Sequence, residues 1–476
     1  MTTRHPGQHR TGQALSTTIN GALAAEDLQS LLFSQHTHFD HYRRQPLPFA
    51  CVRASGIEID AVELTPDRNG ELLSLLDASG GYGSASLGAG HPAVQRSLNR
   101  ALAEVGYVTD EIGSLERARL LQRLFGENGL WREQFPDDQY RVSGRNSGSE
   151  GMELALRLVL ESRFDSRRLR YRPGREQRNT ILAFEGAWHG WTHGLLPLLN
   201  RRHYRVGLPV PAPENDYGVR VEHIPFGDPT VIRDYFAENS DRLLAVFIEP
   251  IQGDAGILLP PQGYLRTVAD LCVSNEVLLV ADEVLTFAKS GRFFAMTDDG
   301  PVHTDITVIG KGLGMGVLST SMVIARRELG VRSSGTVATS DLRPLTCALI
   351  NDGLSYFMEN RLLEHSVALG RHLIRKLRNE LVEQFPDIYS ASRGIGVMHG
   401  VELTDKAAAK LDSLRISLIR AGTYVEFMAG AGKRSHGLRY VHPTLRIVLP
   451  LITTFEQTDA IAYRLREGTR LFQQSL

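Results

Sequence analysis

Short apolar runs alternate with helix-length amphipathic segments through the middle of the chain. These runs hold four to six residues each and are rich in β-branched side chains, which is typical of strands buried on both faces of a parallel sheet. We therefore predict a large α/β domain with a mostly parallel sheet flanked by helices, from about residue 95 to residue 350. The predicted strands are residues 180–184, 243–248, 277–281, 306–309 and 322–325.

The two ends of the chain have other patterns. Leucines at helical spacing predict a short helix at 22–33, and a longer stretch of apolar residues at helical spacing predicts a helix at 354–385. Residues 1–94 are expected to contribute to a small domain and to one wall of the site, and residues 351–476 to form a smaller α+β domain. Further short elements are predicted at 51–59, 71–76, 394–403, 411–421 and 445–450.

Composition narrows the class of protein. The 476 residues include 53 lysines and arginines and 54 acidic residues, a balance that gives no electrostatic reason to expect nucleic acid or a membrane surface as partner. The three cysteines are too few and too scattered for a disulfide framework or a four-ligand zinc site, so no metal is expected. No signal peptide or membrane span is recognisable, and a cytoplasmic protein is the expectation.

Lys311 stands between the apolar run 306–309 and a glycine-rich turn. The carboxyl end of a strand is where an open α/β sheet presents its chemistry, although a lysine in such a position is usually a solvated charge. The glycines at 310, 312, 314 and 316 fit neither the P-loop nor the dinucleotide fingerprint. The role of the lysine must therefore be found from other residues.

Asp282 and Glu283 end another apolar run, 278–283. This pattern is similar to a Walker B motif, which requires an upstream P-loop that the chain lacks. The alternative use of such a carboxylate is to hold a protonated heterocyclic nitrogen. Pyridoxal phosphate requires that carboxylate and also a lysine that binds its aldehyde, and Lys311 follows Asp282 by one strand–loop–strand unit.

A site for the phosphate is expected at the start of a predicted helix. Ser147 and Glu150 are spaced as a capping box, and the small residues Gly148 and Ser149 leave backbone N–H groups open at the helix N-terminus. An ordinary helix cap explains these residues nearly as well. The three signals together occur in the order that one cofactor needs.

On these residues the chain resembles the class III pyridoxal-phosphate aminotransferases of fold type I, the family that contains ornithine, 4-aminobutyrate and glutamate-semialdehyde aminotransferases. The resemblance covers residues 79 to 453, most of the chain. Its motifs are SGSEG (147–151), FEGAWHGWT (184–192), FIEPIQGDAGILLPPQGYL (247–265), LLVADEV (278–284), IGKGLGMG (309–316), RGIGVMHGVEL (393–403) and LRIVLPL (445–451).

The resemblance implies a role for each matching residue around the cofactor. Lys311 would form the internal aldimine and then move the substrate proton, while Asp282 would pair with the pyridine nitrogen. Gly148 and Ser149 would hold the phosphate, and Thr339 would add a hydroxyl to it from the partner subunit of a homodimer. The remaining cofactor contacts would be Trp188 stacked on the ring with His189 beside it, Val284 on the opposite face, and Glu249 behind the cofactor.

Three residues are expected on the substrate side. Arg446 matches an arginine that receives a substrate carboxylate, which suits its planar fork. Tyr82 lies in the glycine-rich loop 79–92, which is either a flexible connector or a pocket wall, and the second interpretation is favoured. Arg343 would lie near the wall contributed by the dimer partner.

The chain departs from the family in two segments. Residues 286–291 read TFAKSG, one residue shorter than the family pattern and with Lys289 in place of its arginine. Residues 339–344 read TSDLRP, and a shifted loop would make Thr336 the phosphate ligand instead of Thr339. Both changes concern the substrate, so use of the cofactor is the firmer expectation.

The resemblance implies a pyridoxal-phosphate-dependent aminotransferase that moves an amino group between a small-molecule donor and a keto or aldehyde acceptor, in specialised biosynthetic metabolism. Racemisation, decarboxylation, or β/γ-elimination and replacement would start from the same bound substrate, and a non-enzymatic scaffold is a third hypothesis. The segment 162–179, with seven arginines, is either a solvated surface loop or a landing site for a phosphorylated, nucleotide-derived or carrier-bound substrate.

Overall fold

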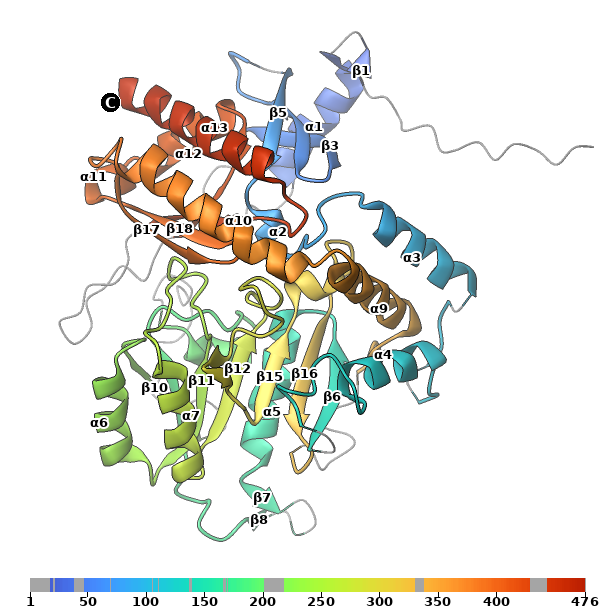
Figure 1. The fold of residues 1–476 in the computed structure, drawn as a ribbon, viewed down its shortest axis with the longest axis vertical. Helices are drawn as coiled ribbons and strands as arrows, with labels where there is room; N and C mark the ends of the chain where they lie inside the picture. The colour runs from blue at the N-terminus through green and yellow to red at the C-terminus, as the bar shows by residue number, and fades with distance from the viewer. Residues whose placement is uncertain are drawn as a thin grey trace, which may run out of the picture.

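The structure is a computed structural model of the 476-residue chain. It describes residues 18–19, 22–37, 47–68, 70–104, 106–109, 111–136, 139–165, 168, 170–200, 218–329, 338–428 and 443–475. A large sheet with its helices fills one half of the molecule, and the N-terminal strands and C-terminal helices lie together in the other (Figure 1). Within the described ranges, no helix is both long and apolar enough to cross a membrane.

The large sheet has seven strands in the order β10-β9-β11-β12-β15-β16-β6, and the first five run parallel. β16 is antiparallel to both β15 and β6, so the sheet is mostly parallel, as predicted. Five of its strands were predicted within two residues at either end, but β6 and β10 were not. The strands are β6 (Tyr140–Arg145), β9 (Thr180–Phe184), β10 (Arg220–Ile224), β11 (Leu243–Ile248), β12 (Leu278–Glu283), β15 (Ile306–Ile309) and β16 (Ser321–Arg326).

Helices cover both faces of this sheet, which explains why its central strands are apolar throughout. In β11, Ala245 and Phe247 pack toward α5, whereas Val246 and Ile248 pack toward α6 and α7. Successive side chains of a strand point to opposite faces, so a strand covered on both sides must be apolar at every position. The helices are α5 (Gly148–Glu161), α6 (Pro229–Asn239) and α7 (Tyr264–Ser274).

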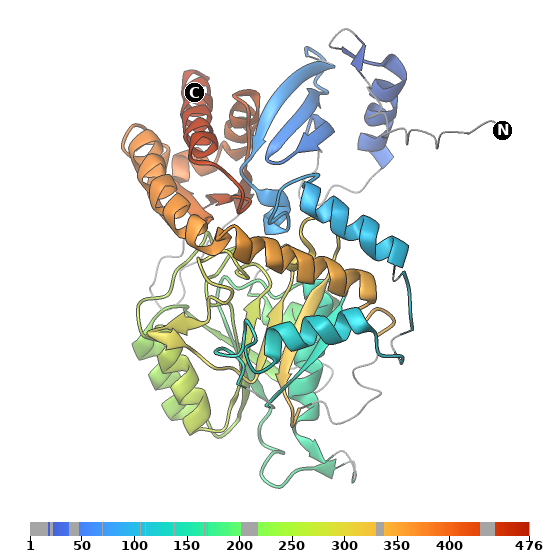
Figure 2. The same cartoon turned by 45° about the vertical axis from the view of Figure 1, so that its right-hand side comes forward.

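The small part of the molecule combines both ends of the chain. Its two sheets have the orders β17-β18-β21-β20 and β19-β5-β4-β3, and β19 pairs parallel with β5 although some 350 residues separate them. Figure 2 shows the N-terminal strands beside the C-terminal helices. The strands are β3 (Phe49–Ser55), β4 (Glu58–Glu63), β5 (Glu71–Asp77), β17 (Tyr389–Ile395), β18 (Met398–Leu403), β19 (Thr423–Tyr424), β20 (Glu426–Met428) and β21 (Thr444–Val448).

The single helix predicted at 354–385 is wrong, because the chain forms α9 (Pro344–Glu359) and then α10 (Leu362–Leu377) with a π-helical end, η4 (Arg378–Val382). Arg361 breaks the helix with φ +52°, a left-handed conformation that an α-helix cannot continue through. α9 also runs through the boundary expected between residues 350 and 351. The remaining helices are α1 (Ala25–Thr37), α2 (Gly80–Gly83), α3 (Pro92–Glu104), α4 (Leu115–Phe125), η1 (His193–Leu198), η3 (Lys311–Gly314), α11 (Asp405–Ala408), α12 (Leu411–Arg420) and α13 (Phe455–Gln474).

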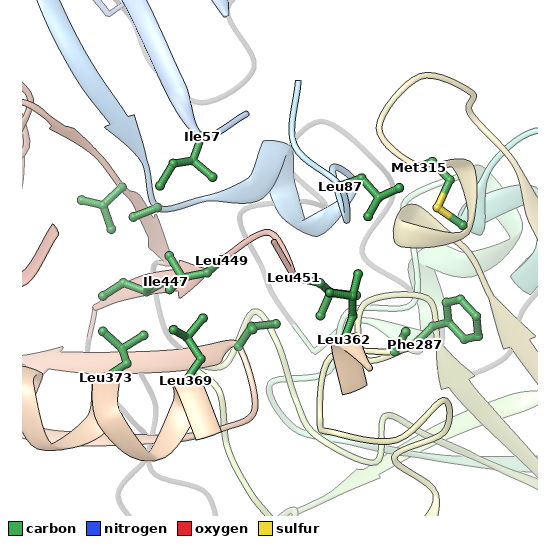
Figure 3. Packing of buried hydrophobic residues seen from close by; sticks show 14 of the residues in the cluster. Ile57, Leu87, Phe287, Met315, Leu362, Leu369, Leu373, Ile447, Leu449 and Leu451 are labelled. Atoms are coloured by element: carbon green, nitrogen blue, oxygen red, sulfur yellow. The ribbon is translucent and has the colours of Figure 1, made fainter. Parts of the chain in front are cut away.

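One apolar cluster extends from the C-terminal part to the turn that follows β15. It brings Leu449 and Leu451, after β21, together with Leu87 from the glycine-rich loop and with Phe287 and Met315 (Figure 3). Met315 ends η3 and is fully buried. The turn that carries Lys311 is therefore packed from both parts of the molecule, which restricts its movement.

Short hairpins complete the described chain. The arginine-rich segment contains β7 and β8, which pair antiparallel, and Arg178 donates to the backbone carbonyls of Leu243 and Asn275. Arg175 pairs with Glu276 at 3.1 Å. Several of these arginines thus have structural partners. The hairpin strands are β1 (Thr18–Ile19), β2 (Ala22–Leu23), β7 (Phe164–Asp165), β8 (Arg170–Tyr171), β13 (Thr297–Asp298) and β14 (Gly300–Pro301).

Candidate active site

Lys311 lies at the carboxyl end of β15, as the first residue of η3. Its φ of +42° is uncommon for a residue with a side chain and persists only where the surrounding packing enforces it. Burial lowers the pKa of Lys311, and the nearby charge of Arg446 lowers it further. The turn therefore holds an amine that loses its proton more readily than a solvated lysine does.

Asp282 lies on the neighbouring strand, at the same edge of the sheet. The β12–β15 ladder pairs Asp282 with Val308 and therefore sets the carboxylate beside the end of β15. Its Oδ2 is 2.9 Å from Nδ1 of His189, and its Oδ1 accepts a hydrogen bond from the backbone N–H of Val284. Nε2 of His189 is buried and has no partner among the described residues.

Glu249 follows β11 and fixes the backbone of the loop that carries His189. One of its oxygens accepts from the N–H of Trp188 at 2.8 Å, and the other accepts from the N–H of Gly253 at 3.1 Å. Burial raises the pKa of this carboxyl, and the nearby His189 opposes that effect. The structure thus brings Glu249, Trp188, His189 and Asp282 together at the carboxyl ends of β9, β11 and β12.

The start of α5 meets the same edge. Ser147 caps the helix by accepting from the N–H of Glu150, as predicted, although the Glu150 carboxylate returns to the N–H of Asn146 instead of to Ser147. A Cβ on Gly148 would lie 2.6 Å from Cγ1 of Val284. The first turn of α5 is therefore packed tightly against the strand end that carries Asp282. The N–H groups of a helix's first turn have no partner within the helix, and they suit an anion.

Arg446 is engaged by two carboxylates. It lies in β21, 2% exposed, and donates to Glu426 through Nε and to Asp254 through Nη1, both at 2.8 Å. The sequence interpretation gave neither acid a role. Asp254 lies inside one of the motifs quoted from the sequence. Glu426 is a single charged residue between apolar residues on a short strand, and this isolated charge is the signal by which the sequence could have pointed to Glu426.

Lys289 is a buried lysine next to the turn that carries Lys311. It is 3% exposed, its Nζ donates to the carbonyl of Phe287, and Nζ would lie 3.0 Å from a Cβ on Gly312. Burial lowers its pKa to about 7. Lys289, which differs from the family pattern described above, therefore lies against the turn that carries Lys311.

Three predicted residues lie outside this group. Thr339 is exposed, and its carbonyl accepts a hydrogen bond from Arg343, whose guanidinium lies 5.1 Å from the ring centre of Tyr107. Tyr82 is 38% exposed in α2, one residue before Gly83, which packs against Leu285. The alternative phosphate ligand, Thr336, lies outside the described residues.

The sequence model of the class-III aminotransferases matches residues 44–467. The chain belongs to this family. Like its relatives, this class-III aminotransferase is a pyridoxal-phosphate-dependent transaminase of fold type I. The prediction of family, fold and cofactor from the sequence is thereby confirmed.

Its curated relatives include ornithine aminotransferase 2 of Staphylococcus saprophyticus, which is 30% identical over 391 residues, 79% of this chain and 87% of the relative. The ornithine aminotransferase of Bacillus cereus strain Q1 is 30% identical over 377 residues, 78% of this chain and 85% of the relative. Similarity of this extent spans both parts of the fold.

Solved structures share the fold at lower identity. The ornithine aminotransferase of Toxoplasma gondii, whose active site holds PLP at partial occupancy, superposes with a TM-score of 0.76 at 23% identity, covering 95% of this chain and 96% of its own. An (S)-enantioselective omega-transaminase of Thermomicrobium roseum gives a TM-score of 0.74 at 22% identity, covering 94% and 99%.

The aminotransferase site fits pyridoxal phosphate on its own geometry. Gly148 has no room for a Cβ at the start of α5, Asp282 is a buried carboxylate at the end of β12, and Lys311 carries an amine of lowered pKa. These are the kinds of group that the phosphate, ring nitrogen and aldehyde of the cofactor require. When bound, the cofactor supplies an electron sink for the bond that the substrate breaks.

Proposed function

We propose that Lys311 binds the cofactor's aldehyde and then moves the substrate proton. This proposal rests on its place at the end of β15 and on its lowered pKa. Asp282 is proposed to hold the ring nitrogen, with its geometry fixed by His189 and by the N–H of Val284. These contacts keep the Asp282 carboxylate oriented while substrate enters and leaves.

The remaining cofactor contacts are proposed from the same edge of the sheet. Gly148 and Ser149 would bind the phosphate with the backbone N–H groups that open α5. Trp188 and Val284 would lie on the two faces of the ring, and Glu249 would hold the Trp188 backbone in position. Both Trp188 and Val284 are half-buried, which leaves surface for a flat ligand.

The amino donor is proposed to be a diamino acid of the ornithine type, because the curated relatives named above are ornithine aminotransferases. The acceptor is a 2-oxo acid or an aldehyde. The departures at 286–291 and 339–344 support a place in specialised biosynthesis, with Tyr82 and Arg343 on the substrate side. The three cysteines, all free, support a cytoplasmic location.

We propose a homodimer with shared sites. Thr339 is exposed on the single chain, as a residue that completes a partner's site would be. It lies next to Arg343 and Tyr107, close to a group of exposed apolar side chains around α3 and α4. Exposed apolar groups of this kind mark association surfaces.

Single-turnover chemistry tests the proposed function. The holoenzyme mixed with ornithine and no acceptor should release one carbonyl product per site, and turnover should resume when a 2-oxo acid is added. Lys311→Ala should lower turnover by about 10²-fold or more, the contribution of a lost acid–base group. Mass spectrometry after borohydride reduction should find the cofactor on the wild type and not on this variant.

Lys406→Ala, at an exposed lysine, is the matched control and should retain both properties. Full turnover in Lys311→Ala would refute the role of Lys311. Loss of the donor without a carbonyl product would instead favour racemisation or decarboxylation.

A further inference from the structure

Trp191 is a large apolar side chain at the surface of the site. It is 53% exposed, although tryptophan on average buries most of its surface. It lies in the loop between β9 and η1, two residues after His189, which this loop brings to the Asp282 carboxylate. Its indole lies beside that of Trp188, with 5.9 Å between the ring centroids and 52° between the ring planes. The exposed indole therefore adjoins the ring that is proposed to cover the cofactor.

The backbone on both sides of Trp191 is packed against α5. Before it, Gly190 has φ +93°, and a Cβ there would lie 2.5 Å from Oγ of Ser149, a residue proposed to hold the phosphate. After it, the Thr192 hydroxyl donates to the Glu153 carboxylate. These two contacts restrict the backbone at position 191 and relate it to the cofactor's place. An aromatic group on a restricted backbone loses little entropy when it binds a ligand.

The surface that Trp191 adds to the site is aromatic and uncharged. The acids that its loop contacts, Glu153, Glu249 and Asp282, are each hydrogen-bonded to that loop. An aromatic surface favours an apolar or aromatic group, which stacks on it and removes its area from water. Ornithine, the proposed donor, has only a short methylene chain between charged groups. The group that covers Trp191 is therefore expected on the other substrate, the acceptor.

We propose that Trp191 determines specificity for the amino acceptor: its exposed indole stacks on an aromatic or bulky apolar group of the carbonyl substrate. This inference rests on the proposed transamination and deepens it by giving the chemical class of the acceptor. The site then prefers 2-oxo acids or aldehydes that carry such a group over those that lack it. Contact between a phenyl group and an indole is expected to supply discrimination of about tenfold.

The test uses enzyme loaded with pyridoxamine phosphate, so that an acceptor can react without any donor. The second-order rate constant for phenylpyruvate divided by that for pyruvate measures the effect of the phenyl group alone. This ratio should favour phenylpyruvate in the wild type, fall about tenfold in W191A, and stay close to the wild-type value in W191F, which keeps an aromatic ring. Calorimetry of the pyridoxal-phosphate form with phenylpropionate, which cannot react, should show about tenfold weaker binding to W191A.

Y463A is the matched control, because Tyr463 is an aromatic residue of nearly the same exposure, 55%, on α13. It should change neither the acceptor ratio nor the affinity for phenylpropionate. W191L gives a further variant if W191A does not fold. It keeps apolar area and removes the aromatic ring, so the acceptor ratio should fall by about threefold, the aromatic part of the interaction.

An unchanged acceptor ratio with unchanged phenylpropionate affinity in W191A would overturn the proposal. A W191A protein that is smaller than the wild type in sedimentation velocity would also overturn it, because a partner subunit and not the substrate would then cover Trp191. A loaded wild type that converts no carbonyl acceptor would contradict the proposed function instead. In that case the affinity for phenylpropionate still decides whether Trp191 binds an apolar group.

Discussion

Lys289 shows how a single buried residue can make the stability of the fold depend on pH. Its amine is buried, donates to the carbonyl of Phe287 at 3.3 Å, and lies beside the turn of Lys311. Burial lowers its pKa to about 7, with a further lowering from Lys311. An unfolded lysine keeps its proton up to about pH 10.4. Between these values the unfolded chain binds more protons than the folded one, so stability rises with pH across this window.

Replacement of Lys289 by methionine should remove that slope. From about pH 7.5 to about pH 9, the unfolding free energy of the wild type should rise by up to about 2 kcal/mol relative to Lys289→Met, since other titrating groups cancel in the difference. Urea unfolding of both proteins at the two pH values measures this. Lys406→Met, at an exposed lysine, should follow the wild type. An equal change in the unfolding free energy of Lys289→Met and of the wild type between the two pH values would show that Lys289 does not titrate in this window.

At the scale of elements, the site is made where the N-terminus of α5 meets the end of β12. A Cβ on Gly148 would come within 2.6 Å of Val284, so the helix can approach the strand only because residue 148 is glycine. The approach aims backbone N–H groups at the position proposed for the phosphate. Gly148→Ala should therefore weaken cofactor binding by about tenfold or more, with the dissociation constant measured by absorbance titration of the apoenzyme.

A double variant separates steric displacement from other effects of the substitution. Val284→Ala removes the methyl groups that an alanine at 148 would meet, so the Gly148→Ala/Val284→Ala protein should recover much of the lost affinity. Val273→Ala, at a valine of α7 that is 79% exposed, is the control and should leave the affinity for the cofactor unchanged. Additive losses in the double variant would show that the two positions do not interact.

The elements also show what the sequence can and cannot predict. β11 and β15 are buried at every position, so their apolar runs stand out and their ends were predicted correctly. β10, at the edge of the sheet, has polar residues at Arg220, Glu222 and His223 and lacks an apolar run, so it was missed. The break at Arg361 was also missed, because the apolar residues around it keep helical spacing and nothing in that spacing indicates a left-handed backbone.

At the scale of the whole molecule, residues distant in sequence determine which contacts the site residues make. Lys311 and Asp282 were singled out because each stands at the end of an apolar run, and the pairing of β12 with β15 sets these two strand ends side by side. The pairing of Arg446 with Glu426 and Asp254 requires the register of β20 and β21 and the course of the loop after β11. No local pattern holds that information, so the substrate side of the site was the part the sequence predicted least.

Assembly is the remaining property at this scale. Four apolar side chains from the end of α3 to the start of α4 are 58% to 66% exposed, which is unfavourable for an isolated chain. They are Leu102, Tyr107, Ile112 and Leu115. Arg343 lies over the ring of Tyr107 and donates to the Thr339 carbonyl, so this apolar group adjoins the residue proposed to complete the partner's phosphate site.

Charges placed in that apolar group should separate the subunits. In sedimentation velocity the wild type should have twice the 52.8 kDa mass of the chain, and Ile112→Asp/Leu115→Asp should shift it to the monomer with loss of turnover. Val273→Asp, at a valine that is 79% exposed on α7, is the control and should remain dimeric and active. A monomeric variant that retains full turnover would place Thr339 outside the catalytic site, because each site would then be complete within one chain.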